Sequence, residues 1–241
     1  MVKLSIILPT YNEKENIKRM IPELHEFLEK NRISGEIIVA DDNSPDKTWK
    51  QAEEMKKKFP EIRVLKRKKL EGVGAALRDA YNIAKGDLIL SMDADCALEV
   101  KEISRLLKGI DGGFDLVIGS RFMSKSKFQK TSLVIRLRGI ISKWGNLYTS
   151  LVTLTPINDF SLNFRVMKKE VWKKIDPPDN RNFFLAEMAI LAKIKGFKVK
   201  SVPVSFKERT YGQSKTRVLN QFVVFLFKTL KYAFFLQWLY K

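Results

Sequence analysis

Short runs of apolar residues alternate, along the first half of the chain, with longer segments in which apolar side chains recur every three or four positions. The short runs are rich in Ile, Leu and Val and predict strands buried on both faces, whereas the longer spacing predicts helices. This alternation predicts an α/β fold with a mostly parallel sheet flanked by helices. The predicted strands are residues 4–8, 36–40, 63–66, 88–92 and 116–118, and the predicted helices are residues 15–30, 45–59, 74–84 and 100–110.

The pattern becomes less regular after Arg121. Residues 124–130 are polar and basic and predict a loop. The segments that follow predict a helix at 132–154, a strand at 164–167, helices at 169–175 and 184–194, and a last strand at 199–206. The sequence has no internal repeat and no linker rich in Pro, Gly or Ser. We therefore expect one domain over residues 1–215, followed by an amphipathic helix over residues 216–241.

Composition and charge narrow the class of protein. An apolar fraction of 45% and an aromatic fraction of 11% are those of a folded chain and exclude a disordered one. The 45 Lys and Arg residues outnumber the 27 Asp and Glu residues, and the net charge is +18. Such a charge predicts an anionic partner, which could be a nucleic acid, an acidic membrane surface or a phosphorylated small molecule. A single cysteine excludes an internal disulfide framework.

Polar residues follow three of the predicted strands, at the edge where open α/β sheets bind ligands. Pro-Thr-Tyr-Asn-Glu ends the first strand, Asp-Asp-Asn-Ser the second and Asp-Ala-Asp the fourth. In an extended chain every second side chain points the same way, so the carboxylates of Asp93 and Asp95 lie close together. They repel each other unless a cation lies between them. Mg²⁺ or Mn²⁺ takes such oxygen ligands and shares them with substrate phosphates. The alternative is a solvated acidic turn that binds nothing.

Several short motifs occur in a fixed order along the chain. They are Pro-Thr-Tyr-Asn-Glu at 9–13, Asp-Asp-Asn-Ser-Pro-Asp-x-Thr at 41–48, Asp-Ala-Asp at 93–95, Gly-Ser-Arg at 119–121 and Arg-x-x-Gly-x-Ser-Lys at 209–215. This set resembles the family 2 glycosyltransferases, and within them most of all the dolichol-phosphate mannose synthase branch. The resemblance implies a GT-A (nucleotide-diphospho-sugar transferase) fold and transfer of a sugar from a nucleotide sugar to a polyprenyl phosphate.

The resemblance also implies roles for individual residues. Asp93 and Asp95 would hold Mg²⁺ or Mn²⁺ and the donor diphosphate, and Arg138 and Ser142 would contact the acceptor phosphate. The catalytic residues would be Asp95, Arg121 and Arg209. The nucleotide-sugar site would comprise Pro9, Tyr11, Glu13, Ala40, Asp42, Asp93, Ala94, Asp95, Arg121, Arg209 and Lys215.

The expected reaction needs no general base. The acceptor phosphate oxygen is already anionic, so it can displace the nucleoside diphosphate directly at the anomeric carbon of the sugar, with inversion. Because two phosphorylated substrates meet at one site, their repulsion must be cancelled by a metal ion and by fixed cationic side chains.

The resemblance implies transfer of mannose from GDP-mannose, and three departures from the family pattern leave a UDP-glucose-dependent dolichyl-phosphate glucosyltransferase as the alternative. Residues 97–98 are Ala and Leu where Gln or Ser-His is frequent, and Phe183 stands where a Lys usually precedes the retained Glu187. The loop at 159–164 usually reads Asp-Pro-x-Ser-Gly-Phe, and Asn163 stands here in place of its glycine. We expect Asn163 to adopt the left-handed conformation that glycine supplies.

Membrane association is predicted from the C-terminal segment. No uninterrupted apolar run is long enough to cross a bilayer, and the N-terminal run reads as a strand rather than a signal peptide. When residues 217–231 are placed around a helix, the polar residues fall within an arc of about 100°. These residues are Arg217, Asn220, Gln221, Lys228 and Lys231.

The C-terminal helix is expected to lie in the membrane interface, with Lys228 and Lys231 at the headgroups of an anionic surface. Residues 232–240 are almost wholly apolar and would add to the attachment. The protein would then be peripheral at the cytoplasmic face of the membrane, and a membrane-embedded subunit is a further candidate partner. The alternative is a helix packed on the protein's own core.

A nucleic-acid-binding protein is the rival class suggested by the charge. Such a protein would interleave basic residues with exposed aromatic ones and would carry no cluster of carboxylates in its cleft. The acidic residues at the strand ends would repel a phosphate backbone. We therefore expect no nucleic-acid partner, and expect a nucleotide sugar (GDP-mannose or UDP-glucose) and a polyprenyl phosphate instead.

Overall fold

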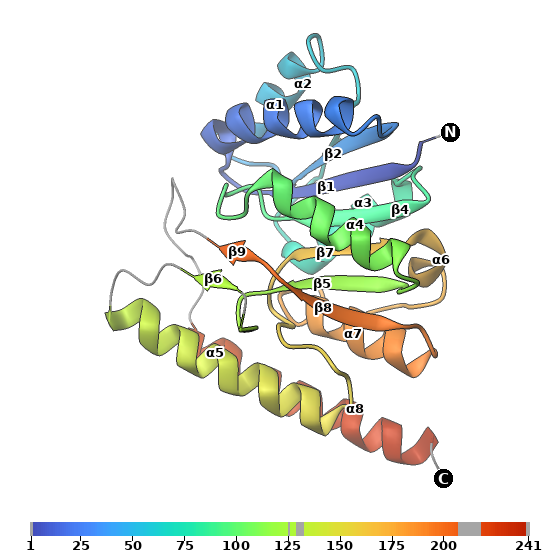
Figure 1. The fold of residues 1–241 in the computed structure, drawn as a ribbon. Coiled ribbons are helices and arrows are strands. Elements are labelled where there is room, and N and C mark those ends of the chain that lie inside the picture. Colours follow the sequence, from blue (N-terminus) through green and yellow to red (C-terminus); the bar gives the residue numbers. More distant parts are fainter. Residues whose placement is uncertain (1, 125, 129–132, 207–217, 240–241) are drawn as a thin grey trace.

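The computed structural model describes residues 2–124, 126–128, 133–206 and 218–239, and it gives the backbone alone for 127–128, 133–138, 218–222 and 234–239. Within these residues the chain forms a central sheet with helices on both faces (Figure 1). Two long helices, α5 (Leu133–Val152) and α8 (Val218–Leu239), run along one side of this sheet.

The larger sheet has seven strands in the order β3-β2-β1-β4-β7-β5-β8. Strand β7 runs antiparallel to its neighbours β4 and β5, and the other pairs in this sheet are parallel. The predicted mostly parallel α/β sheet is therefore confirmed. The strands are β1 (Leu4–Thr10), β2 (Gly35–Asp41), β3 (Ile62–Lys66), β4 (Leu88–Met92), β5 (Leu116–Ser120), β7 (Phe164–Lys168) and β8 (Val199–Pro203).

Alternate side chains of each central strand pack on opposite faces of the sheet. Ile6 and Leu8 of β1 lie in one core, with helices α1 (Lys14–Lys30), α2 (Thr48–Met55) and α4 (Ile103–Asp111). Ile7 lies in the other core, with α3 (Val73–Ile83), α6 (Lys169–Trp172) and α7 (Phe184–Ile194). A short 3₁₀ helix, η1 (Val100–Glu102), precedes α4. Burial on both faces explains why these strands read as continuous apolar runs.

The second half of the chain differs from the prediction in two places. The segment predicted as a basic loop contains a two-residue strand, β6 (Lys127–Phe128), which pairs in parallel with β9 (Ser205–Phe206). The predicted last strand is interrupted at Val204, so that β8 extends the main sheet and β9 leaves it to join β6. A strand of two residues has no periodicity, and only a distant partner creates it.

Helix α8 is joined to the domain by polar contacts with two buried carboxylates. Lys228 pairs with Asp179, and the Tyr232 hydroxyl donates to Glu187 Oε1 at 3.0 Å. Tyr232 and Thr229 are buried, and α8 also packs against α5. The prediction that Lys228 lies at lipid headgroups is therefore wrong, because its ammonium group faces a carboxylate of its own chain. The face of α8 that carries Thr229 and Tyr232 packs on the protein's own core, as the alternative prediction states.

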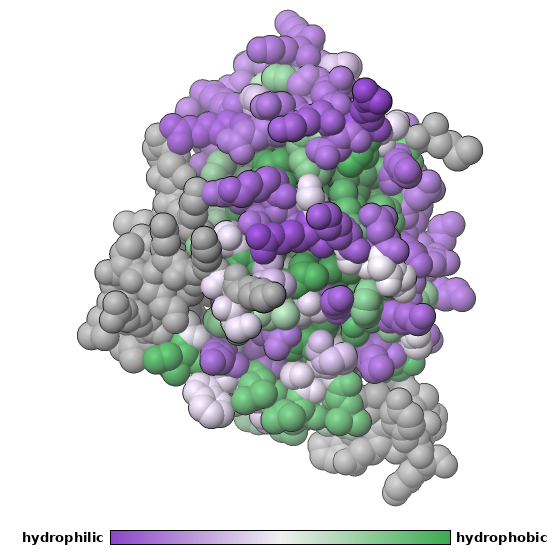
Figure 2. Space-filling model, in the orientation of Figure 1, coloured by the Kyte–Doolittle hydropathy of each residue, from purple (hydrophilic) through white to green (hydrophobic). Residues whose placement is uncertain are grey.

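The solvent-exposed faces of α5 and α8 carry apolar side chains, and we call this set of side chains the apolar band. Trp144 of α5 is 64% exposed and Phe227 of α8 is 71% exposed. Figure 2 shows apolar side chains gathered along the lower side of the view, where the two helices run in Figure 1. In the described part of the chain, no helix is both long and apolar enough to cross a membrane. The band consists of Ile140, Trp144, Leu147 and Leu151 of α5 and Val223, Val224, Phe227 and Leu230 of α8.

A buried carboxylate ties three strands of the sheet together. Glu36 of β2 accepts hydrogen bonds from Ser5 Oγ of β1 and from the Lys85 backbone N–H, both at 2.6 Å, and pairs with Arg63 of β3. Burial by itself would raise the pKa of Glu36, but hydrogen bonds from Ser5, Arg63 and Lys85 outweigh it and lower the pKa below its ordinary value of 4.5.

We expect Glu36→Gln to lower the free energy of unfolding at pH 7 by about 1–3 kcal/mol, because charge-assisted hydrogen bonds are lost. Since the folded-state pKa is lowered, this contribution is present above pH 4.5 and is lost as the pH falls through the folded-state pKa. Urea unfolding of both proteins between pH 7 and pH 3 measures the difference. The exposed Glu15→Gln is the control, and a difference that does not shrink with pH would contradict the role given to the charge.

Candidate active site

The loops that follow β1 and β2 are hydrogen-bonded to one another at the carboxyl edge of the sheet. Asp41, the last residue of β2, accepts from Thr10 Oγ1 at 3.0 Å and from the backbone N–H of Ser44 at 2.8 Å. Ser44 Oγ accepts in turn from the backbone N–H of Asn12 at 3.0 Å. The two polar segments predicted at neighbouring strand ends therefore lie side by side.

Asp42 is held by an arginine that the sequence analysis did not identify. Its buried carboxylate pairs with Arg67, which follows β3. The same guanidinium donates from Nε to Asp79 Oδ2 at 2.8 Å and from Nη2 to Glu71 Oε2 at 2.7 Å, so it joins the end of β2 to the segment before α3 and to α3 itself. Arg67 lies in the basic run 66–69, where nothing in the sequence distinguishes it from its lysine neighbours.

Asp93 and Asp95 follow β4 directly and are both engaged by the protein. Asp95 is 4% exposed, and its Oδ1 accepts from the Ala97 backbone N–H at 3.0 Å. Asp93 Oδ1 accepts from Asn163 Nδ2 at 3.0 Å. Between the aspartate pair and Ala97, Cys96 has a φ of 57° and turns the chain. Burial raises the pKa of the Cys96 thiol to about 11, so at neutral pH it is no nucleophile.

These two carboxylates fit a hard divalent cation such as Mg²⁺ or Mn²⁺. Both offer oxygen ligands, and hydrogen bonds from the chain hold each of them in place. Among the described residues, no group of three or more His, Cys, Asp or Glu side chains converges as a ready-made metal site. An ion at Asp93 and Asp95 would therefore take its remaining ligands from water and substrate phosphates, as Mg²⁺ commonly does.

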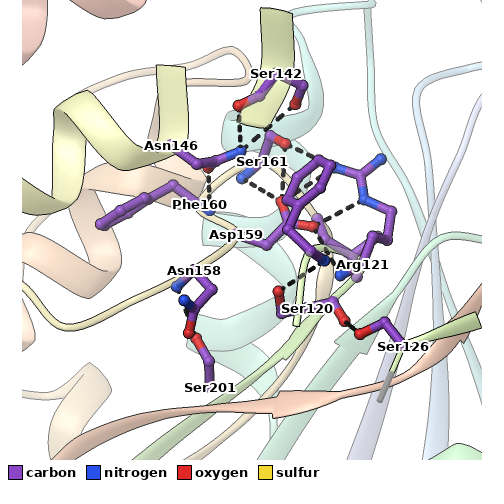
Figure 3. Close-up of polar contacts among 12 residues, drawn as sticks. Ser120, Arg121, Ser126, Ser142, Asn146, Asn158, Asp159, Phe160, Ser161 and Ser201 are labelled. Atoms are coloured by element: carbon purple, nitrogen blue, oxygen red, sulfur yellow. Dashed lines mark hydrogen bonds and ion pairs between the residues drawn. The ribbon is translucent and has the colours of Figure 1, made fainter. Parts of the chain in front are cut away.

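Arg121 is a fixed positive charge beside the aspartate pair. It follows β5, and its guanidinium donates two hydrogen bonds to the buried Asp159, from Nε to Oδ2 at 2.8 Å and from Nη2 to Oδ1 at 3.0 Å (Figure 3). The backbone N–H of Arg121 donates to Asp159 Oδ2 as well, at 3.3 Å. Burial by itself would lower the pKa of Arg121, but the charges of Asp159, Asp93 and Asp95 raise it above its ordinary value. The guanidinium therefore stays charged at the place where the sequence predicted a contact with the donor phosphates.

Asn146 links helix α5 to the segment that holds Arg121 (Figure 3). Its Oδ1 accepts from the Phe160 backbone N–H at 2.6 Å, and its Nδ2 donates to the Ser142 carbonyl at 2.7 Å. Asn146 and Phe160 are buried. Ser142, which is expected to contact the acceptor phosphate, is thus connected through the Asn146 side chain to the backbone of Phe160, the residue that follows Asp159.

Most of the predicted site residues lie on or directly after the carboxyl ends of β1, β2, β4 and β5. Those described there are Pro9, Tyr11, Glu13, Ala40, Asp42, Asp93, Ala94, Asp95 and Arg121. The side chain of Arg138 and the whole of Arg209 and Lys215 lie outside the described residues. The expectation for Asn163 is wrong, because its φ is not positive and its side chain contacts Asp93 instead.

Comparison with known proteins relates the sequence to one family. Residues 5–176 match the profile of the family described as Glycosyl transferase family 2. The dolichol-phosphate mannosyltransferase of Pyrococcus furiosus is 34% identical over 219 residues, which are 90% of this chain and 60% of that protein. The polyprenol monophosphomannose synthase of Mycolicibacterium smegmatis is 33% identical over 217 residues, 87% of this chain and 79% of that protein. The chain thus spans less than two thirds of the Pyrococcus protein.

Solved structures share the fold at lower sequence identity. Mannosyl-3-phosphoglycerate synthase from Rubrobacter xylanophilus superposes with a TM-score of 0.67 at 18% identity, covering 95% of this chain and 73% of that one. Glucosyl-3-phosphoglycerate synthase from Mycobacterium tuberculosis, in complex with Mn²⁺, UDP and glucosyl-3-phosphoglycerate, has a TM-score of 0.67 at 16% identity and covers 95% and 80%. At these identities the likeness concerns the fold alone.

Proposed function

The chain belongs to the family 2 glycosyl transferases and has their GT-A fold, and from this we propose that it transfers mannose from GDP-mannose to a polyprenyl phosphate. The observation that carries the proposal is that Arg121, held by Asp159 after β5, lies at the same carboxyl edge of the sheet as Asp93 and Asp95 after β4. A divalent ion and a guanidinium together match the charge of a nucleoside diphosphate. The names of the Pyrococcus and Mycolicibacterium relatives support mannose as the sugar and a polyprenyl phosphate as the acceptor.

The proposed transfer is a direct displacement. The acceptor phosphate oxygen attacks the anomeric carbon, the bond from that carbon to the donor diphosphate breaks, and its electron pair leaves with the nucleoside diphosphate. Asp93 and Asp95 would hold Mg²⁺ or Mn²⁺, and a bound ion would supply positive charge to the leaving diphosphate. Asp159 holds the Arg121 guanidinium with two hydrogen bonds, so this group can stabilise the same charge without reorganising. No proton is removed from the acceptor, so no general base is required.

We propose roles for the remaining site residues around the aspartate pair and Arg121. Ser142 and Arg138, both on α5, would contact the acceptor phosphate, while Arg209 and Lys215 would close over the donor diphosphate. Arg209 would join Asp95 and Arg121 as a catalytic residue. The nucleoside would lie among Pro9, Tyr11, Glu13, Ala40, Asp42 and Ala94.

Attachment to a membrane would bring the acceptor to this site. A polyprenyl chain resides in lipid, and the apolar band includes the outward face of the helix that carries Ser142. The net charge of +18 favours an anionic leaflet. We place the protein peripherally at the cytoplasmic face of the membrane, with the apolar band against lipid and Lys231 near the headgroups.

The variant Trp144→Glu/Leu151→Glu tests this attachment. Because each exposed apolar side chain that enters lipid contributes about 1.5–3 kcal/mol, we expect binding to anionic liposomes to fall at least tenfold. Turnover of a short soluble prenyl phosphate should change little. Co-sedimentation measures binding, and Ile83→Glu, at an exposed apolar position far from the band, is the matched control. If the wild-type protein ignores vesicles, a membrane-embedded subunit becomes the candidate cover for the band.

Donor and acceptor are tested together with a panel of substrates. The protein is incubated with dolichyl phosphate, Mg²⁺ or Mn²⁺, and GDP-mannose, GDP-glucose, UDP-glucose or UDP-galactose, and the lipid-linked product is scored. We expect product from GDP-mannose and none after addition of EDTA. Product from UDP-glucose alone would replace mannose by glucose in the proposal, and binding of oligonucleotides without transfer to any lipid would overturn it.

A further inference from the structure

A line of hydrogen bonds runs through the core to the first aspartate of the pair. Tyr81 Oη of α3 donates to Ser91 Oγ of β4 at 2.7 Å, and Ser91 Oγ donates to Asn163 Oδ1 at 2.8 Å. Asn163 Nδ2 then donates to Asp93 Oδ1 at 3.0 Å. Asn163 directly precedes β7.

The chemistry of each member sets the direction of the line. An ionised carboxylate only accepts hydrogen bonds, so the end of the Asn163 amide that faces Asp93 is its NH₂ group. The carbonyl end therefore faces Ser91, whose single hydroxyl hydrogen is donated to it. The Ser91 oxygen is left to accept from the Tyr81 hydroxyl. The amide of Asn163 thus has one favoured orientation, determined from both sides.

The line is enclosed by the protein. Tyr81, Ser91 and Asn163 are 1%, 0% and 2% exposed, so water does not compete for their hydrogen bonds. Arg165, two residues further along β7, is 1% exposed and donates to the backbone carbonyls of residues 160, 162 and 185. Its side chain ties the backbone directly before Asn163 to β7 and to α7. Asn163 is therefore a rigid donor rather than a surface side chain that meets Asp93 by chance.

We propose that Asn163 is a positioning residue that fixes the carboxylate of Asp93 for binding of a divalent ion, a role that rests on the proposed metal-dependent transfer. A carboxylate that loses the hydrogen bond from Asn163 can turn more freely about its side-chain torsions, and its geometry as a ligand is less strictly fixed. Groups that orient metal ligands in this way change metal affinity by about 10–100-fold when they are removed.

Binding of Mn²⁺ in the presence of GDP, followed by electron paramagnetic resonance, measures this role apart from turnover. We expect Asn163→Ala to raise the apparent Kd for Mn²⁺ by about 10–100-fold. Ser91→Ala, which removes the donor to the amide carbonyl and lets the amide turn, should raise the Kd less. Tyr81→Phe is the matched control, because it removes one buried hydroxyl of the line and leaves both contacts of Asn163 in place. Its Kd should equal that of the wild type.

The outcomes separate a positioning role from a structural one. Thermal unfolding of each variant is measured alongside, since a merely structural Asn163 would lower the melting temperature and leave the Kd for Mn²⁺ unchanged, which would overturn the proposal. A wild-type protein that binds no Mn²⁺ with GDP or UDP would overturn it as well. If the wild type binds Mn²⁺ as expected but forms no lipid-linked mannose, the proposed function fails while the role of Asn163 stands on the binding data.

Discussion

Replacing Asp95 by alanine is expected to abolish sugar transfer while the protein stays folded. The substitution removes one of the two carboxylates proposed to hold the divalent ion at the leaving diphosphate, and loss of one preorganised charge-stabilising group typically slows a reaction by about 10²–10³-fold. The folded state loses the hydrogen bond that the Ala97 backbone N–H donates to Asp95, which costs about 1 kcal/mol. Formation of lipid-linked mannose measures the rate, and circular dichroism measures the fold.

Two controls make this result specific. Asp95→Asn keeps the shape of the side chain and an acceptor for the Ala97 N–H but removes the charge, so it should be nearly as inactive as Asp95→Ala. Asp111→Ala removes an exposed carboxylate at the end of α4 and should transfer at the wild-type rate. Normal transfer by Asp95→Ala, or wild-type activity that survives EDTA, would contradict the metal site.

The largest effect on stability is expected from Asp159→Ala. Asp159 is 0% exposed and accepts two hydrogen bonds from the guanidinium of Arg121, whose side chain is 18% exposed, and a third from the Arg121 backbone N–H. Removing one partner leaves the other charge without compensation, and the cost of breaking a buried ion pair is about 3–5 kcal/mol. Urea unfolding should show a loss near the lower end of this range, because part of the guanidinium still reaches water. Transfer should also fall, since Arg121 is released.

A double-mutant cycle tests whether the pair itself is responsible. Arg121→Met, which keeps the length of the aliphatic side chain, is combined with Asp159→Ala. We expect the double variant to be less destabilised than the sum of the two single variants, because the uncompensated charge is gone. Additive effects would mean that Asp159 acts mainly through its hydrogen bonds from the backbone N–H and the hydroxyl of Ser161.

Helix α8 shows how periodicity can identify a helix and still misplace its faces. The spacing of polar residues between 217 and 231 predicts a helix with one polar arc, and α8 covers most of that segment. The arc does not face outward as a whole, because its Lys228 pairs with Asp179. Tyr232, one turn later on the same side of α8, donates to Glu187. Helical periodicity describes only the contrast between two faces of a helix. It does not say which face meets the protein when the domain offers buried carboxylates as partners.

The sequence by itself determined the elements of the α/β sheet, the strand ends that carry the chemistry and the aspartate pair, because these depend on local patterns of two to four residues. The tertiary structure alone decided which partners meet. It placed Arg67 on Asp42, Asp159 on Arg121 and Asn163 on Asp93, and it paired β6 with β9. Each of these contacts joins residues 25 or more positions apart, or two short strands with no periodicity of their own. Long-range contacts of this kind depend on how the chain packs as a whole, and no local pattern encodes them.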